Sequence, residues 1–188
     1  MAVLDVVLWP APVLATRASE VTDFNDELRH FIANMRQTMK AASGIGLAAN
    51  QVGDLRRIII IEIPWSEARE GEEQDAKEWW HNKVFNLVNP VITKKAGKYK
   101  YQEGCLSFPD LFEFVDRAAE VWVSAQDEHG KAVDLHATGL LSVCLQHEID
   151  HIDGVVFIER MSRLKANMAR RKLARRGAPI HDTDPEKV

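Results

Sequence analysis

A chain of 188 residues is long enough for one well-buried core and short for two, so the sequence predicts a single domain. With 46% hydrophobic residues, 28% charged residues and a net charge of -4, the composition is that of a globular protein and excludes a largely disordered or fibrous chain. No apolar run approaches the roughly 18 residues of a membrane span, and the N-terminus lacks the basic start of an export signal. We therefore expect a cytoplasmic protein without membrane contact, in which Cys105 and Cys144 are free thiols.

The first third of the chain predicts a helix, a glycine loop and a strand. Apolar residues recur with helical spacing over 23–40, with Thr22 or Asp23 as the N-cap and a stop at 43–44. The loop is Gly-Ile-Gly-Leu-Ala-Ala-Asn-Gln, residues 44–51. The β-branched run over 57–63 then predicts a strand.

The middle of the chain predicts several short strands. Residues 64–83 lack periodicity and are interpreted as a long excursion whose two tryptophans pack beneath a loop. A strand over 84–92 is expected to end in a turn at Asn89-Pro90. Further strands are expected at 98–103, 112–115 and 121–126, followed by a hairpin-type turn at 128–131.

The C-terminal third predicts two helices. Residues 140–152 form a strongly apolar helix that stops at Asp153-Gly154, and 155–158 form a short strand or extended piece. Residues 160–176 carry eight of the 24 basic residues and no acid, and they form a basic helix. Its apolar positions Met161, Leu164 and Met168 are expected to tie it to the body. Because strands and helices do not alternate regularly, the fold class is α+β.

The apolar helix carries an HExxH pattern, His147-Glu148-Ile149-Asp150-His151. Residues four apart on a helix share a face, so both imidazoles can reach one divalent cation while Glu148 lies beside it. Two histidines and two acids in a buried helix are destabilising unless they have partners, which favours a metal site over a chance match. The extended pattern of metzincins ends in a third histidine, but Phe157 occupies that position, so this class is excluded.

A catalytic site needs a third protein ligand, and the two thiols are the candidates. Cys144 and His151 are separated by about 10 Å of helix rise, so one straight helix cannot bring both to a single ion. Cys144 is therefore interpreted as a core or pocket-wall residue. Cys105 lies in a glycine-containing segment that can approach the helix at an angle; its alternative interpretation is a buried inert thiol.

The glycine loop superficially matches a dinucleotide fingerprint. That fingerprint requires a strand before it and a helix after it, and here the order is reversed, so a nucleotide cofactor is not expected. The glycines instead permit close approach of an extended ligand, and the Gln51 carboxamide can face a developing oxyanion. Taken alone, Gln51 is equally consistent with a solvated loop residue.

The segments GIGLAANQ, EGCLS and QHEIDH occur in this order, and over most of 3–175 the chain resembles bacterial-type peptide deformylase. The resemblance implies an α+β fold with antiparallel or mixed sheets packed around a central HExxH helix, a C-terminal helix, and a catalytic domain spanning 1–176 with a flexible tail at 177–188. It implies hydrolysis of the formyl group from N-terminal formyl-methionine of nascent polypeptides, with release of formate.

The resemblance also implies the roles of individual residues. The metal ligands would be Cys105, His147 and His151, holding one divalent ion, Fe(II) in the cell, with Zn or Ni tolerated. Glu148 would transfer the proton, while Gln51 and the Leu106 backbone N–H would meet the oxyanion. Extended substrate would pair with Ile45, Gly46 and Gly104, and its methionine would enter a pocket formed by Gly44, Tyr101, Leu140, Val143 and Cys144. Related enzymes dock a C-terminal helix at the ribosome, which implies an rRNA contact for 160–176; a solvated face is the alternative.

One position departs from the family pattern. Many relatives carry two arginines after EGCLSFP, whereas here Phe112 occupies the first position and only Arg117 remains, which predicts a more apolar rim. Glu103, Arg117 and Asp150 are expected to form an ion-pair network that orients the ligands, ordinary surface pairing being the alternative. Two rival functions remain: a non-catalytic RNA-binding module with a structural metal, and a metallopeptidase.

Overall fold

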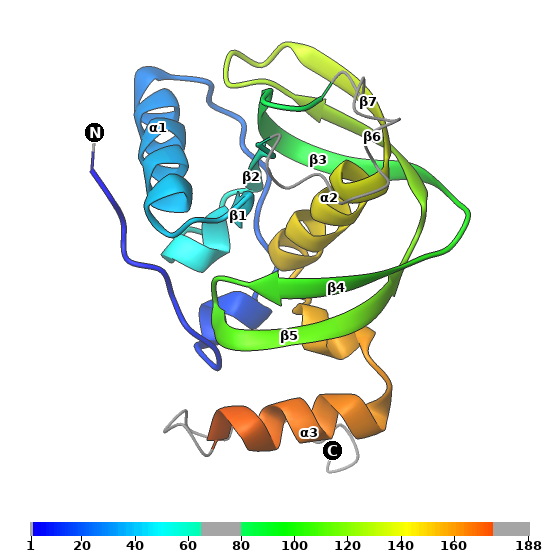
Figure 1. Ribbon diagram of the computed structural model, residues 1–188. Helices are drawn as coiled ribbons and strands as arrows, with labels where there is room; N and C mark the ends of the chain where they lie inside the picture. The colour runs from blue at the N-terminus through cyan, green and yellow to red at the C-terminus, as the bar shows by residue number, and fades with distance from the viewer. Residues whose placement is uncertain (1, 65–79, 175–188) are drawn as a thin grey trace.

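The computed structural model describes residues 2–64 and 80–174, and within them seven strands form two antiparallel sheets (Figure 1). The larger sheet runs in the order β1 (Gly46–Ala48), β2 (Ile58–Glu62), β3 (Val84–Ala96), β6 (Glu120–Gln126) and β7 (Ala132–Thr138). The smaller sheet pairs β4 (Tyr99–Cys105) with β5 (Phe108–Arg117). The predicted α+β class is therefore confirmed.

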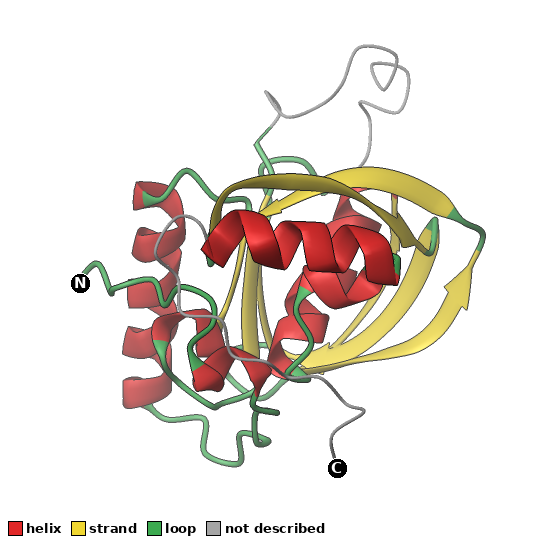
Figure 2. Ribbon diagram, turned by 90° about the horizontal axis from the view of Figure 1, so that it is seen from below, coloured by secondary structure: helices red, strands yellow, loops and turns green. Residues whose placement is uncertain are grey.

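Three α-helices pack with these sheets (Figure 2). They are α1 (Asp26–Ala41), α2 (Gly139–Ile152) and α3 (Arg163–Ala174), with short 3-10 turns η1 (Pro12–Ala15), η2 (Ala49–Val52) and η4 (Phe157–Arg160). Helix α2 lies between the large sheet and the β4–β5 hairpin, and α3 lies beyond β5 (Figure 1). None of the described helices is long and apolar enough to cross a membrane.

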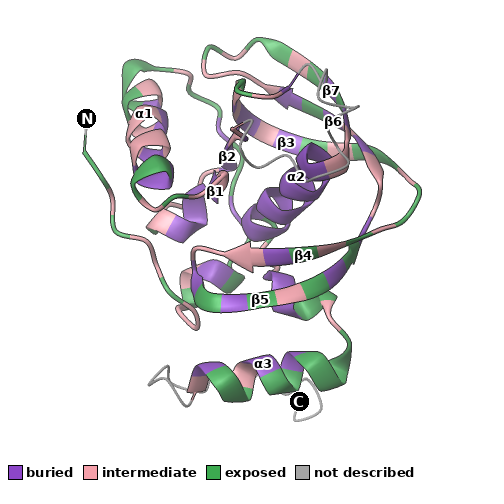
Figure 3. Ribbon diagram, viewed as in Figure 1, coloured by how far each residue is buried: buried purple, intermediate pink, exposed green. Residues whose placement is uncertain are grey.

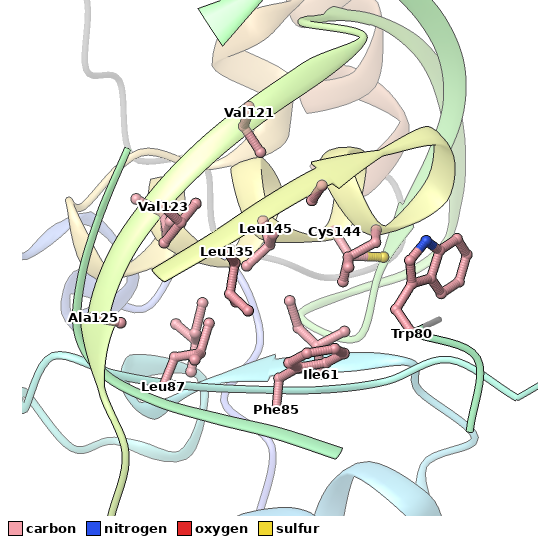
Figure 4. Close-up of a cluster of buried hydrophobic side chains, with 14 of the residues drawn as sticks. Ile61, Trp80, Phe85, Leu87, Val121, Val123, Ala125, Leu135, Cys144 and Leu145 are labelled. Carbon is pink, nitrogen blue, oxygen red and sulfur yellow. The ribbon is translucent and has the colours of Figure 1, made fainter. Parts of the chain in front are cut away.

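The unbroken isoleucine run of β2 is explained by helices on both faces of this part of the sheet. Ile59 and Ile61 belong to the core beneath α2, which Figure 4 shows in close-up. Ile58 and Ile60 face the opposite side and pack with the apolar stripe of α1. Because both faces are covered, the strand does not alternate between apolar and polar residues.

Helix α2 is the centre of the molecule. Every residue from Leu140 to Ile152 is buried, in contrast to the largely exposed α3 (Figure 3). Its apolar side chains supply much of the core against the large sheet. Its polar side chains are therefore held in a dry environment, where each one needs a specific partner.

Most predicted elements are confirmed, but several boundaries were wrong. The first helix is capped by Asn25, whose side chain accepts a hydrogen bond from the Leu28 N–H, and not by Thr22 or Asp23. The glycine loop contains the short strand β1 and the turn η2. β7 had no predicted range, and the 3-10 turn η4 begins at Phe157, within the short strand or extended piece that was expected at 155–158.

The strand over 84–92 does not end at Asn89-Pro90. β3 continues to Ala96, and the dipeptide forms a bulge in its pairing with β6, where Asn89 has a φ of 53°. The Asn89 side chain accepts a hydrogen bond from Val21 N–H and donates one to Val21 C=O, so it satisfies backbone groups that would otherwise lack partners.

The predicted packing stripe of the C-terminal helix was wrong for Leu164 and Met168, which are exposed. Met161 packs against the core under β5 as predicted, but it precedes the helix. The face that contacts the body carries Ala166, Ala169 and Leu173, and the latter two belong to the core under β5. Most of the 64–83 excursion, including Trp79, and the predicted tail at 177–188 lie outside the described residues. Trp80 is buried in the large core and not beneath a loop.

Candidate metal centre and active site

Helix α2 presents His147 and His151 on one face, one turn apart. Both side chains are buried, and their ring centroids lie 4.9 Å apart. This is the arrangement that the i, i+4 spacing predicts.

Cys105 reaches this helix from the end of β4. The pairing of β4 with β5 shifts register between Glu103 and Cys105, which redirects the chain at the site. The Cys105 Sγ lies 3.2 Å from His151 Nε2, and one donor atom from each of Cys105, His147 and His151 lies within 4.8 Å of the other two. These three residues are the only such group among the described residues, and Cys144 is not part of it.

The orientation of His147 is fixed by a carboxylate behind it. The His147 Nδ1–H donates to Glu103 Oε2 at 2.8 Å. Nε2 is therefore the ring nitrogen that can bind a metal ion. Arg117 holds Glu103 in turn with two hydrogen bonds, from Nε to Oε1 at 2.6 Å and from Nη2 to Oε2 at 2.9 Å. A bidentate pair of this kind fixes the carboxylate in both position and direction.

The network extends further than the sequence predicted. Arg117 Nη1 also donates to Asp150, and Asp150 accepts two hydrogen bonds from Arg160, just before α3. The predicted grouping of Glu103, Arg117 and Asp150 is present in the structure, but Arg160 was missed. No local pattern signals it, because Arg160 is ten residues from Asp150 and separated from it by a turn.

Burial and neighbouring charges shift the pKa values of these groups in different directions. Burial raises the pKa of Glu103, but hydrogen bonds from Arg117 and His147 outweigh it and bring the pKa to about 2. Burial, together with the positive charges of His147 and Arg117, holds the pKa of His151 well below its usual value, so this ring is neutral. For His147, burial lowers the pKa, but Cys105 and Glu103 more than compensate and hold the pKa well above its usual value.

Glu148 follows His147 on α2 and lines the cavity beside the candidate ligands. Its carboxylate is buried, and Oε2 has no hydrogen-bond partner among the described residues. Burial raises the pKa of Glu148 to about 7, while the positive charge of His147 acts in the opposite direction. Gly46 of β1 lies against this carboxylate, and a Cβ atom there would collide with Oε1. Gly46 thus leaves room for the Glu148 side chain.

Gln51 is buried in η2 and points its amide at the thiol. Its Oε1 accepts the Ala48 N–H at 2.8 Å, which orients Nε2 toward the site. Nε2 lies 3.4 Å from Cys105 Sγ and 3.2 Å from Ser107 Oγ. The interpretation of Gln51 as a solvated loop residue is therefore wrong.

A cavity of about 520 Å³ opens beside these groups. Its lining includes all eight residues predicted for substrate binding: Gly44, Ile45, Gly46, Tyr101, Gly104, Leu140, Val143 and Cys144. Gln51, Cys105, Leu106, His147 and Glu148 also line it. Burial raises the pKa of Cys144 well above its usual value, so this wall residue stays an uncharged thiol. The lining residues Ser43, Pro109 and Leu111 were missed, and only their proximity to the motifs would have suggested them.

The donor set fits a divalent ion. The thiol comes from β4, and the two imidazoles come from α2. The Nδ1 of His151 is also buried without a partner among the described residues. Three protein ligands beside a cavity with an adjacent carboxylate define the site of a mononuclear metallohydrolase.

Comparison with known proteins identifies the family. The family model described as polypeptide deformylase matches residues 3–167. The chain belongs to this family of metal-dependent hydrolases, which remove the N-formyl group from nascent peptides.

Individual relatives support the same assignment along almost the full chain. Peptide deformylase of Chromobacterium violaceum is 43% identical over 94% of this chain and 97% of its own length. The crystal structure of peptide deformylase from Legionella pneumophila is 36% identical with a TM-score of 0.79, covering 96% and 100% of the two chains. The Ehrlichia chaffeensis enzyme, solved in complex with actinonin, is 33% identical with a TM-score of 0.83, covering 95% and 100%.

Proposed function

We propose that this chain hydrolyses the formyl group from N-terminal formyl-methionine and releases formate, using the site on α2. The observation that carries the proposal is the buried Glu148 carboxylate beside three converging ligand atoms at the wall of a cavity, with its Oε2 lacking a hydrogen-bond partner among the described residues. A carboxylate buried without a partner is destabilising, and such groups persist where they have a task.

Cys105, His147 and His151 would hold one divalent ion. Bound there, such an ion lowers the pKa of water to near neutrality and polarises a carbonyl group. A thiolate with two imidazoles is compatible with Fe(II), Zn and Ni, and we propose Fe(II) as the ion used in the cell. Glu103 keeps the ligand His147 in one tautomer, and Arg117 keeps Glu103 ionised.

Glu148 would move the proton. With a pKa of about 7, its carboxylate can accept a proton from the attacking water at neutral pH and can deliver that proton to the departing amine. Gln51 Nε2 and the Leu106 N–H would donate hydrogen bonds to the oxygen that becomes negative during attack. The hydrogen bond that Oε1 of Gln51 accepts from Ala48 keeps Nε2 directed into the site before substrate arrives.

The substrate would bind as an extended strand. Ile45 and Gly46, at the start of β1, and Gly104, on β4, all line the cavity, and we propose that backbone groups of both segments pair with a peptide bound there. The methionine side chain would enter the apolar pocket between Tyr101, Leu140, Val143 and Cys144. Met is unbranched and flexible, which suits an irregular apolar cavity.

The basic helix is proposed as a ribosome contact. In α3 the exposed surface is rich in arginine and lysine, a composition that suits an RNA phosphate backbone. We place the protein in the cytoplasm and treat 1–176, including the helix at 160–176, as one catalytic unit. Deleting residues 170–188 is expected to weaken ribosome binding, most strongly at low salt; binding that is unchanged by the deletion would exclude this role.

The activity is tested by formate release from formyl-Met-Ala after anaerobic purification. The wild type is expected to release formate, and Glu148→Ala is expected to lose this activity while retaining its metal ion. Cleavage of internal peptide bonds with formyl peptides untouched would identify a metallopeptidase instead. A protein without hydrolytic activity that binds RNA would favour the structural-metal alternative, which requires a fourth protein ligand; the described residues supply three.

A further inference from the structure

Two large aromatic side chains lie exposed on one face of β5. Phe112 is 63% exposed and Phe114 is 46% exposed. They are two residues apart in a strand and therefore point to the same face of the β4–β5 hairpin. Leu111 and Val115 point to the opposite face, where they join the core with α3.

Phe112 differs from Phe114 because it also lines the cavity of the active site. Its ring covers Gly104 of the neighbouring strand: a Cβ atom at Gly104 would lie 2.6 Å from Cε1 of Phe112. The absence of a side chain at Gly104 therefore lets this ring lie at the edge of the cleft. Phe114 pairs with Gln102, and although Gln102 lines the cavity, Phe114 itself does not.

The two faces of β4 are chemically distinct near the cleft. Tyr101 and Glu103 point inward, Tyr101 against the core and Glu103 to the His147 ring. The side of Gly104 that Phe112 covers is the opposite, outward side. The inner face thus belongs to the catalytic site, and Phe112 provides an apolar surface on the outer face directly beside it.

We propose that Phe112 is a specificity-determining residue that favours an apolar side chain at the substrate residue directly after methionine. This inference rests on the proposed function. Successive side chains of an extended peptide alternate between faces. When the methionine side chain points inward to the cavity, the next side chain points outward beside Gly104, within reach of the Phe112 ring as a diagonal neighbour.

The inference is tested with formyl-Met-Phe-Ser and formyl-Met-Ala-Ser assayed on the same enzyme preparation. The ratio of the two kcat/KM values is independent of how much enzyme is folded. We expect the wild type to favour the Phe peptide by about fivefold, in line with the strength of an aromatic pair. The preference is expected to lie in KM, because the contact is the same before and during the chemical step.

The variant Phe112→Ala is expected to reduce the ratio to near one. Phe114→Ala is the matched control, with the same residue type on the same face outside the cleft, and it is expected to keep the wild-type ratio. With formyl-Met-Asp-Ser as a third substrate, Phe112→Arg is expected to favour this peptide over formyl-Met-Phe-Ser, because the arginine attracts the aspartate charge. A ratio that Phe112→Ala leaves unchanged overturns the inference while leaving deformylation intact, whereas no formate from any formyl peptide rejects the proposed function itself.

Discussion

Replacing Arg117 with methionine is expected to remove much of the stability of the ion-pair network behind the metal site. The Arg117 side chain is 4% exposed, and its partners Glu103 and Asp150 are 3% and 10% exposed. Methionine has a similar length but no charge, so Glu103 loses both hydrogen bonds from Arg117 and Asp150 loses one. Removing one member of a buried ion pair costs about 3 to 5 kcal/mol, and we expect a loss in that range for Arg117→Met.

The effect of the substitution depends on pH in a defined direction. In the wild type the pKa of Glu103 is lowered to about 2, so its contribution to stability is present above the unfolded value near 4.5 and is lost as pH falls through 2. Without Arg117 this lowering is diminished. The difference in unfolding free energy between wild type and variant is therefore expected to be largest above pH 4.5 and to narrow in acid.

The assay is urea unfolding in chelator and reductant, so that metal binding does not contribute. Arg160→Met is the matched control, because Arg160 also binds Asp150 but its side chain is 44% exposed. Its loss is expected to be no more than about 1 kcal/mol. A separate competition with a chelator is expected to show metal affinity lowered about 10- to 100-fold in Arg117→Met, since Glu103 orients His147. Equal losses of stability in the two variants would refute the reasoning.

Three further predictions concern other parts of the molecule. Gly46→Ala places a methyl group against Glu148 and is expected to lower deformylation about tenfold or more with metal content unchanged in elemental analysis; full activity would contradict this. Burial raises the pKa of Glu62, but two basic side chains of α1 outweigh it and lower the pKa overall. In urea unfolding, Glu62→Gln is therefore expected to lose up to about 1 kcal/mol of stability at pH 7 and nothing well below pH 4. Leu173→Ala is expected to lose about 2 kcal/mol of stability in the same assay, whereas the stability of Leu164→Ala is expected to stay within about 0.5 kcal/mol of the wild type. A larger loss for Leu164→Ala than for Leu173→Ala would contradict the observed packing face of α3.

The α2 helix could be predicted from sequence because its signals are local. Its apolar content, its Asp153-Gly154 stop and the i, i+4 histidines all lie within one segment, and the observed helix over Gly139–Ile152 agrees with them. The meeting of Cys105 with this helix is a long-range contact set by the β4–β5 register shift. Spacing alone left a buried inert thiol as an alternative, and only the ordered motifs favoured the site.

The C-terminal helix shows where periodicity fails. Met161, Leu164 and Met168 have helical spacing, but so do Ala166, Ala169 and Leu173, and the second set faces the body. Alanines allow close approach of the helix to its neighbours, and the two larger side chains of the first set within the helix remain in solvent. The network through Arg160 escaped prediction for a related reason, since it depends on how η4 packs against α2.

The central claim is that Cys105, His147 and His151 together hold one metal ion. X-ray absorption at the metal edge of the purified protein tests it most directly. The account predicts one sulfur at about 2.3 Å and two nitrogens at about 2.0 to 2.1 Å if the ion is zinc. The sulfur signal is expected to disappear in Cys105→Ala and to remain in Cys144→Ala. A spectrum of the wild type without sulfur, or one that Cys105→Ala leaves unchanged, would contradict the account.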